Sequence, residues 1–251
     1  MKELFPIVHE DAELLVIDKP AGLVCHPTKG DEYSSLISRV RLYLGDDCTA
    51  HLVNRLDRET GGIVVVAKSD ESAKELRRIW ENRKVQKVYR AIVHGMPPSN
   101  EGVVDAPLGN DERSPVAIKD CVRSDGSEAR TEYRVLGSVE RAEGRFSEVE
   151  LRPVTGRKHQ LRIHLAHLGC PIVGDKIYGE DETAYLDFVN DRLTEKGKKA
   201  LIFPNQALHA VTASFEWRDE KWEFVANVSE FFTSFMDGRE FRPVCWPEKP
   251  R

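Results

Sequence analysis

The chain has 251 residues, of which 40% are hydrophobic and 31% charged, and its formal net charge is −5 at pH 7. This length supports one sizeable core, and no stretch reads as a linker, so we predict a single domain over residues 1–251. No apolar run approaches the ~20 residues of a membrane span, and the first residues lack the apolar segment of a signal peptide. The five cysteines are scattered and include no Cys-x-x-Cys pair, which argues against a disulfide framework and against a thiolate zinc site. We therefore expect a cytoplasmic protein with reduced thiols.

The first part of the chain predicts two strands and two helices. The strands are short runs of apolar, largely β-branched residues beside Gly and Pro, and the helices carry apolar residues three and four positions apart. The first helix stops at Gly45, a residue type that commonly ends helices. In chain order these elements are a strand at 14–17, a helix at 34–44, a strand at 63–67 and a helix at 70–82.

The rest of the chain is dominated by strands. Together with the helices they indicate an α+β fold. Two segments interrupt the pattern: residues 97–128 are rich in turn residues and read as an excursion from the core, and residues 180–200 form a charged insertion. The other predicted elements are a strand around Tyr89, a strand at 146–152, a helix beginning near Lys158, a hairpin at 212–227 that turns over 218–221, and a loose tail at 243–251.

Asp57 lies between Arg55 and Arg58, just before the buried strand at 63–67. A carboxylate in a loop that leads into the hydrophobic core calls for a structural or a functional explanation. From spacing alone the simpler interpretation is an ion pair with either arginine that orders a turn, and the second is a catalytic group.

The amino-acid sequence of this loop favours the second interpretation, a catalytic group. The stretch from His51 to Gly62 resembles the signature loop of RluA-type pseudouridine synthases, His-Arg-Leu-Asp-Arg-x-Thr-Ser-Gly, with Asn54 where that family usually has His and Gly61 where it usually has Ser. Further blocks before and after this loop are similar to those of the family and occur in the same order, so that the resemblance runs from about residue 13 to about residue 228. They are 18–27, 87–95, 156–165 with 174–179, and 207–210.

The resemblance implies the pseudouridine synthase fold, with a central mixed, mainly antiparallel sheet flanked by helices, a core at about 13–228 and a C-terminal extension at 229–251. Only about a dozen residues precede the first block, so a stand-alone catalytic domain without an amino-terminal S4 domain is expected. The implied activity is isomerisation of a specific uridine in structured RNA, rRNA or tRNA, to pseudouridine. Structured RNA is then the expected partner, with no membrane and no obligate protein partner, and neither a cofactor nor a metal is expected. The chain also lacks the glycine-rich nucleotide-binding motifs.

The resemblance also implies roles for individual residues. Asp57 is the catalytic carboxylate, as nucleophile or as acid/base group, and Arg162 is its counter-charge. Tyr89 stacks on the target base, with a core tyrosine as the ordinary alternative, and Leu208, on sequence alone a core leucine, lies against the uracil. Because the base must leave its stack, Arg55 is expected to fill the gap or contact phosphate, unless it forms an ion pair.

Arg157 and His159, in the same block as Arg162, complete the predicted RNA-binding residues. His159, His164 and His167 also raise the alternative of a metal-dependent hydrolase. The five-residue spacing from 159 to 164 places those two rings on different helix faces, so structural histidines are the simpler interpretation. A catalytically inactive RNA-binding protein of the same fold is the third alternative.

The negative net charge is unusual for an RNA enzyme, but the segment from Lys74 to Arg90 carries seven basic residues against two acidic ones. We interpret it as a phosphate-contacting face, the alternative being a solvated helix face. A second possible RNA surface lies around Arg157, Lys158 and Lys176.

Overall fold

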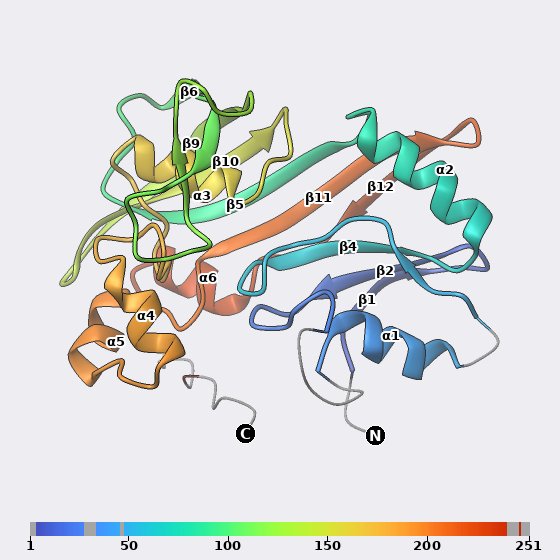
Figure 1. The fold of residues 1–251 in the computed structure, drawn as a ribbon, viewed down its shortest axis with the longest axis horizontal. Coiled ribbons are helices and arrows are strands. Elements are labelled where there is room, and N and C mark those ends of the chain that lie inside the picture. Colours follow the sequence, from blue (N-terminus) through green and yellow to red (C-terminus); the bar gives the residue numbers. More distant parts are fainter. Residues whose placement is uncertain (1–3, 28–33, 46–47, 240–245, 247–251) are drawn as a thin grey trace. The chain divides into compact units, whose positions relative to one another are not determined.

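The computed structural model describes residues 4–27, 34–45, 48–239 and 246. The chain forms two compact units (Figure 1): unit 1 comprises residues 1–89 and 209–228, and unit 2 comprises residues 90–208 and 229–251. Each unit is thus built from two stretches of chain. The single domain expected from the sequence stays a prediction.

Unit 1 contains a mixed sheet in the strand order β1-β2-β4-β11, in which β3 also pairs with β4 and β12 with β11. Neighbouring strands are antiparallel except β4 and β11, which are parallel. The elements of unit 1 are β1 (Ile7–Glu10), β2 (Leu14–Lys19), α1 (Leu36–Leu44), β3 (His51–Leu52), β4 (Gly61–Ala67), α2 (Asp70–Glu81), the start of β5 (Gln86–His94), β11 (Leu208–Trp217) after its first residue, and β12 (Glu220–Val225).

The two helices of unit 1 cover opposite faces of the sheet (Figure 1). Successive side chains of a strand point to opposite faces, so the fully buried strand β4 supplies both cores. Val64 and Val66 pack in the cluster that contains the apolar face of α1, and Ile63 and Val65 pack in the cluster that contains α2. This two-sided burial explains why β4 reads as a continuous apolar run.

Unit 2 contains the strand order β5-β10-β9-β6 and a separate two-stranded sheet of β7 and β8. Strand β9 is antiparallel to both β10 and β6, with a bulge at Leu136 of β9, and β7 is antiparallel to β8. The elements of unit 2 are the end of β5, β6 (Glu101–Asp105), β7 (Leu108–Asn110), β8 (Asp120–Val122), β9 (Arg130–Arg141), β10 (Gly144–Pro153), α3 (Gln160–His167), α4 (Thr183–Val189), α5 (Glu195–Leu201) and α6 (Glu230–Met236).

The α+β class, the mixed and mainly antiparallel sheet, and the expected elements of both units are confirmed. The segment 97–128 is only partly an excursion, because it contributes β6 to the main sheet of unit 2. The hairpin turns over two residues, Arg218 and Asp219, both with positive φ, and is tighter than expected. The charged insertion forms α4 and α5, while β9 and α6 had no counterpart among the sequence predictions. The expected tail lies outside the described residues except Trp246.

None of the described helices is long and apolar enough to cross a bilayer. The four described cysteines carry free thiols.

We expect Gly62→Ala to lower the free energy of unfolding by about 3 kcal/mol. Gly62 has φ of +112°, and a Cβ built there would lie 2.2 Å from the carbonyl oxygen of Ala210 on β11. Urea unfolding checks the prediction, with Gly137→Ala as the matched control because a Cβ at Gly137 meets no atom within 4 Å. Equal unfolding midpoints for the two variants would contradict it.

Candidate active site

The first residues of the loop that carries Asp57 are hydrogen-bonded to β4. The backbone N–H of Val53 donates to the carbonyl of Val65 at 2.9 Å. The side chain of Asn54 then continues the ladder, since its Oδ1 accepts from the N–H of Val65 at 2.8 Å and its Nδ2 donates to the carbonyl of Ile63 at 3.1 Å. The residue that departs from the family's usual His therefore has a clear structural role here.

Lys19 holds the part of the loop that follows Asp57, through a hydrogen bond to the carbonyl of Arg58. Its side chain is fully buried, and Nζ donates to the carbonyls of Pro20 at 2.9 Å, Leu23 at 2.8 Å and Arg58 at 3.1 Å. The same Arg58 carbonyl accepts from the N–H of Gly22 at 2.8 Å. Burial lowers the pKa of Lys19 to about 8, opposed by nearby Cys25, Asp57 and Asp18. The first sequence block and the loop are thus held together one residue after Asp57.

Asp57 and Tyr89 interact electrostatically within unit 1. Asp57 is half-buried, and its carbonyl accepts from the N–H of Thr60 at 3.2 Å. Burial raises the pKa of Tyr89 well above its usual value, and the negative charge of Asp57 raises it further. The Tyr89 hydroxyl therefore stays protonated at neutral pH and can donate a hydrogen bond.

Arg55 is exposed on the same loop. Its charge reaches His26 of the first block, whose pKa is lowered by burial and then by Arg55 and Arg41. An exposed guanidinium two residues before Asp57 is available for stacking or phosphate contact.

The start of β4 can be formed only by small residues. A Cβ at Gly61 would lie 2.7 Å from Nδ1 of His209, the residue opposite it on β11. His209 Nε2 lies 3.3 Å from Oδ1 of Asp18 without hydrogen-bond geometry. Gly61, where the family usually has Ser, therefore makes room for the His209 ring.

In unit 2, Gln160 fixes the start of α3 through four hydrogen bonds. Its Oε1 accepts from Thr155 Oγ1 at 2.7 Å and from the N–H of Arg157 at 3.0 Å. Its Nε2 donates to the carbonyl of Arg130 and to Thr131 Oγ1, both at 2.9 Å. Since Gln160 is buried, these bonds connect α3 firmly to β9.

Arg162 is buried on α3 and forms a two-pronged ion pair with Asp175. Its Nε lies 2.6 Å from Oδ2 and its Nη2 lies 2.9 Å from Oδ1. A guanidinium carries five N–H donors, so this pair is compatible with a second carboxylate. The contact between Arg162 and Asp57 implied by the resemblance stays a prediction.

The other predicted residues of unit 2 lie as follows. His159 adopts the left-handed conformation with φ of 55°, and its Nδ1 is hydrogen-bonded to the Tyr178 hydroxyl at 2.9 Å. Arg157 is exposed, and its Nε donates to the carbonyl of Glu128 at 3.0 Å. Leu208 is buried at the start of β11.

The described histidines of α3 have no metal-ligating arrangement. His164 is buried, with Nδ1 hydrogen-bonded to Thr131 Oγ1 at 2.9 Å and Nε2 to the carbonyl of Ala106 at 3.0 Å. Both ring nitrogens thus have protein partners. Within residues 4–27, 34–45, 48–239 and 246, no group of three or more His, Cys, Asp or Glu side chains is arranged to hold a metal ion.

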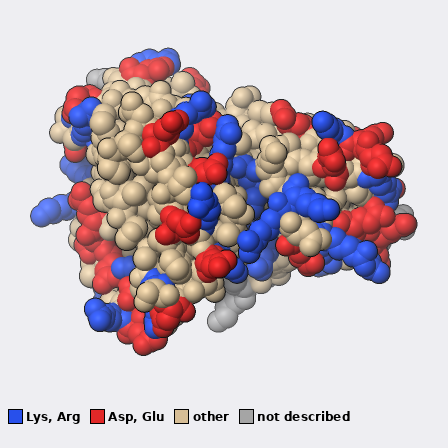
Figure 2. All heavy atoms as spheres, turned by 90° about the horizontal axis from the view of Figure 1, so that it is seen from above, with Lys and Arg blue, Asp and Glu red and all other residues tan. Residues whose placement is uncertain are grey.

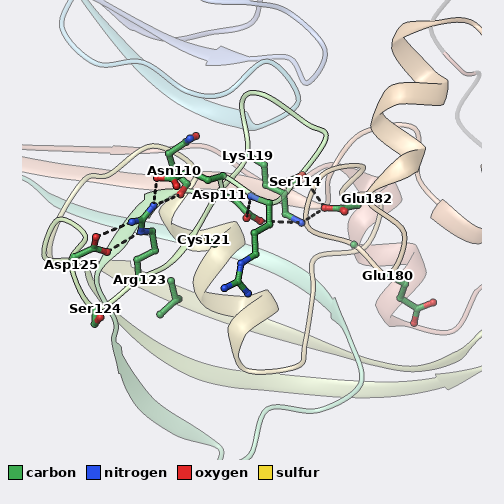
Figure 3. Close-up of a pocket in the computed structure, with 14 residues that line it drawn as sticks. Asn110, Asp111, Ser114, Lys119, Cys121, Arg123, Ser124, Asp125, Glu180 and Glu182 are labelled. Atoms are coloured by element: carbon green, nitrogen blue, oxygen red, sulfur yellow. Dashed lines mark hydrogen bonds and ion pairs between the residues drawn. The ribbon is translucent and has the colours of Figure 1, made fainter.

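An open pocket of about 980 Å³ lies in unit 2 among the β7–β8 excursion and the segment before α4 (Figure 3). Several of its lining charges are paired with one another: Lys119 contacts Glu182, which also accepts from Ser114, and Arg123 binds Asp125 and Glu112. The lining contains five acidic and three basic residues, and none of the predicted site residues. This acidic lining is therefore unsuited to phosphate.

The basic segment of unit 1 has the opposite character. Lys and Arg gather over α2 and the segment that follows it (Figure 2). The exposed members are Lys74, Arg77, Arg78, Arg83 and Lys84.

Arg90, in contrast, is paired with Glu148. The alternative surface around Arg157, Lys158 and Lys176 is corrected in part. Lys176 is buried, with Nζ donating to the carbonyl of Pro204 at 2.6 Å and lying 4.8 Å from the centre of the Phe188 ring. Lys158 remains accessible but pairs with Asp120 at 2.9 Å.

We expect Lys19→Met to lower the free energy of unfolding by about 3 kcal/mol, because it removes a charged donor from three carbonyls, of which that of Leu23 is buried. Urea unfolding measures the effect, and Lys221→Met on the exposed strand β12 is the control. If Lys19→Met unfolds at the same urea concentration as the control, the three hydrogen bonds do not stabilise the loop.

Comparison with known proteins places this geometry in a family. The family model described as RNA pseudouridylate synthase matches residues 13–167. An uncharacterized RNA pseudouridine synthase of Chloroflexus aurantiacus is 41% identical over 167 residues, covering 64% of this chain and 51% of that protein. The dual-specificity RNA pseudouridine synthase RluA of Escherichia coli is 39% identical over 177 residues, covering 70% of this chain and 78% of that protein.

Among solved structures, Human RNA Pseudouridylate Synthase Domain Containing 4 superposes with a TM-score of 0.69 at 30% identity, covering 91% of this chain and 90% of that one. The chain spans only 51%, 55% and 61% of the length of three of its curated relatives. It carries the family's sequence blocks in order, on the family's fold. The chain belongs to the RNA pseudouridylate synthase family, and within it to the RluA type.

Proposed function

We propose that this chain is an RNA pseudouridine synthase that isomerises a specific uridine in structured RNA, with Asp57 as the catalytic carboxylate. The observation that carries the proposal is the placement of Asp57 on a loop that is hydrogen-bonded on both sides, where its charge helps to raise the pKa of Tyr89. Family membership supports the same chemistry.

The reaction leaves the composition of the RNA unchanged. The bond between C1′ of the ribose and N1 of uracil breaks, the uracil turns, and a bond forms between C1′ and C5. C5 loses its proton and N1 gains one, so nothing is oxidised or hydrolysed. An ionised carboxylate against the ribose or base, acting as nucleophile or as acid/base group, together with a nearby proton donor, meets these needs. No cofactor or metal has a part in this scheme.

The substrate uridine has to leave its stack before the carboxylate can reach it. In this proposal Tyr89 stacks on the flipped base and Leu208 lies against the uracil. Arg55, exposed on the loop of Asp57, fills the gap in the RNA or contacts a phosphate. Arg162 provides the counter-charge for Asp57, while Arg157 and His159 contact the RNA.

The RNA is proposed to be ribosomal or transfer RNA in the cytoplasm, with no obligate protein partner. The Pseudomonas aeruginosa relative is named ribosomal large subunit pseudouridine synthase D, and the Escherichia coli relative is named dual-specificity. Mapping pseudouridine at single-nucleotide resolution in cellular RNA, with and without this protein, identifies the uridine.

We expect Asp57→Asn to abolish the isomerisation while RNA affinity and fold stay nearly unchanged, because the substitution removes the charge and keeps the shape. The assay is release of tritium from RNA labelled at C5 of uridine, since C5 gives up its hydrogen in the reaction. Filter binding and urea unfolding serve as controls for affinity and fold. Turnover by Asp57→Asn would assign the catalytic role to another group, and the absence of tritium release by the unsubstituted protein would contradict the proposed function itself.

We expect replacement of Arg77, Arg78 and Lys84 by Gln to weaken RNA binding and to flatten its salt dependence, by up to about one unit of log–log slope for each side chain that no longer neutralises a phosphate. Single-turnover chemistry on saturating RNA should change little, because none of the three side chains is proposed to touch the flipped base. Binding titrations at several salt concentrations measure the slope.

A matched control for this triple variant removes the same three charges from α5 of unit 2, at Lys196, Lys198 and Lys199. Its salt slope should remain that of the unsubstituted protein. Equal slopes for the two triple variants would show that α2 is a solvated helix face and would place the RNA elsewhere.

A further inference from the structure

We propose that Asp175 is a positioning residue for Arg162: it holds the guanidinium in one orientation so that Arg162 can act as the counter-charge of the catalytic carboxylate. The inference rests on the proposed function and deepens it. Asp175 belongs to the sequence block at 174–179, to which the sequence alone assigns no role.

The contact between the two side chains is directional. Asp175 is fully buried and the Arg162 side chain is 6% exposed, and two parallel N–H to oxygen contacts of 2.6 and 2.9 Å join them. A planar guanidinium that uses Nε and one Nη on a single carboxylate cannot rotate about its long axis without breaking both bonds. The pair therefore fixes the plane of the guanidinium as well as its position.

Asp175 is itself fixed by the backbone around it. Its Oδ1 accepts from the N–H groups of Ile177 at 2.9 Å and Tyr178 at 3.0 Å. Glycines flank the turn on both sides, and neither position has room for a side chain. A Cβ at Gly174 would lie 2.4 Å from the carbonyl oxygen of Asn205, and a Cβ at Gly179 would lie 2.4 Å from that of Asp175. A carboxylate held this way is a rigid support for its partner.

The aromatic ring of Tyr178 covers one face of the Arg162 guanidinium. Its ring centre lies 4.9 Å from Cζ of Arg162, a distance at which a cation and an aromatic ring attract each other. The Tyr178 hydroxyl accepts from the N–H of Asp120 at 3.1 Å and is hydrogen-bonded to His159 Nδ1 at 2.9 Å, so the ring cannot turn away. Arg162 is thus held at its edge by a carboxylate and on its face by a ring.

The energetics favour an orienting role over a stabilising one. Burial alone would raise the pKa of Asp175, but Arg162 and the two amides outweigh it and hold the pKa below its usual value. The pair is therefore ionised at neutral pH. Since two buried charges lose about as much hydration energy as they gain from each other, such a pair contributes little net stability compared with apolar residues. What it does supply is a fixed geometry.

The test measures single-turnover tritium release with enzyme in excess over transcribed rRNA and tRNA labelled at C5 of uridine. Asp175→Asn keeps the shape and the acceptor for the two amides but removes the charge. We expect a fall of about 100-fold in the rate at saturating RNA, as for a misplaced catalytic group, with the Kd for RNA within about twofold of the original. Glu148→Gln is the matched control, because Glu148 is a buried carboxylate paired with an arginine elsewhere in unit 2, and its rate should stay within about twofold.

A double-mutant cycle distinguishes positioning from general damage. If Asp175 acts through Arg162, then Asp175→Asn in the background of Arg162→Met produces no further fall in rate. Multiplying losses, or a rate for Asp175→Asn equal to that of the unsubstituted protein, would overturn the proposal. Arg162→Lys covers the case in which Asp175→Asn does not fold: it keeps the charge without the two-pronged contact, so it should also lose rate, and an undiminished rate would overturn the proposal. Absence of tritium release by the unsubstituted protein would instead refute the proposed function.

Discussion

The hydrogen bonds donated by the buried ammonium group of Lys19 are the interaction on which unit 1 depends most. A buried charge is costly unless every donor finds an acceptor, and Lys19 donates to three carbonyls from two separate segments. One of these segments contains the Pro-Gly turn after β2, and the other is the loop of Asp57. Because the Arg58 carbonyl also accepts from Gly22, the backbone next to the proposed catalytic carboxylate has little freedom. The position of Asp57 is therefore set by backbone contacts on either side of it.

Unit 2 uses the same principle with the charges reversed. Asp175 is a buried anion whose acceptors are filled by two backbone amides and by Arg162. In both units a buried ionised side chain with fully used hydrogen bonds fixes a tight, glycine-containing turn. Close approach also requires glycine in both units: Gly62, at the start of β4, leaves room for the backbone of β11, and Gly174 leaves room for that of Asn205.

The sequence predicts elements well where one period dominates. Helices α1 and α2 have clear apolar periodicity and strand β4 is a continuous apolar run, and each is buried as its pattern requires. Strand β9 gave no such signal because only two of its twelve residues, Thr131 and Tyr133, are buried. Helix α6 has seven residues, too few for a reliable pattern. Local periodicity therefore identifies the elements with a large buried face and not the largely exposed strand β9 or the short helix α6.

The residues of the site show the same division. Spacing alone favoured an ion pair for Asp57, and only the resemblance to a family distinguished it from other loop carboxylates. The roles of Lys19 and Asp175 depend on partners far away in the chain or on the shape of a turn, which composition and periodicity do not reveal. Lys176 illustrates the reverse case, since a basic residue expected at a surface is buried against Phe188.

Charge distribution reconciles the net charge of −5 with an RNA substrate. Many acidic side chains of unit 2 are paired with neighbouring cations, as in the pocket where Glu182 binds Lys119 and Arg123 binds Asp125. Such paired charges attract phosphate weakly, because each arginine or lysine already has its anion. Over residues 74–84, in contrast, the exposed basic side chains outnumber the acidic ones. Non-specific affinity for RNA depends on the cations that a phosphate can reach, so a local excess on one segment of unit 1 can outweigh an unfavourable total.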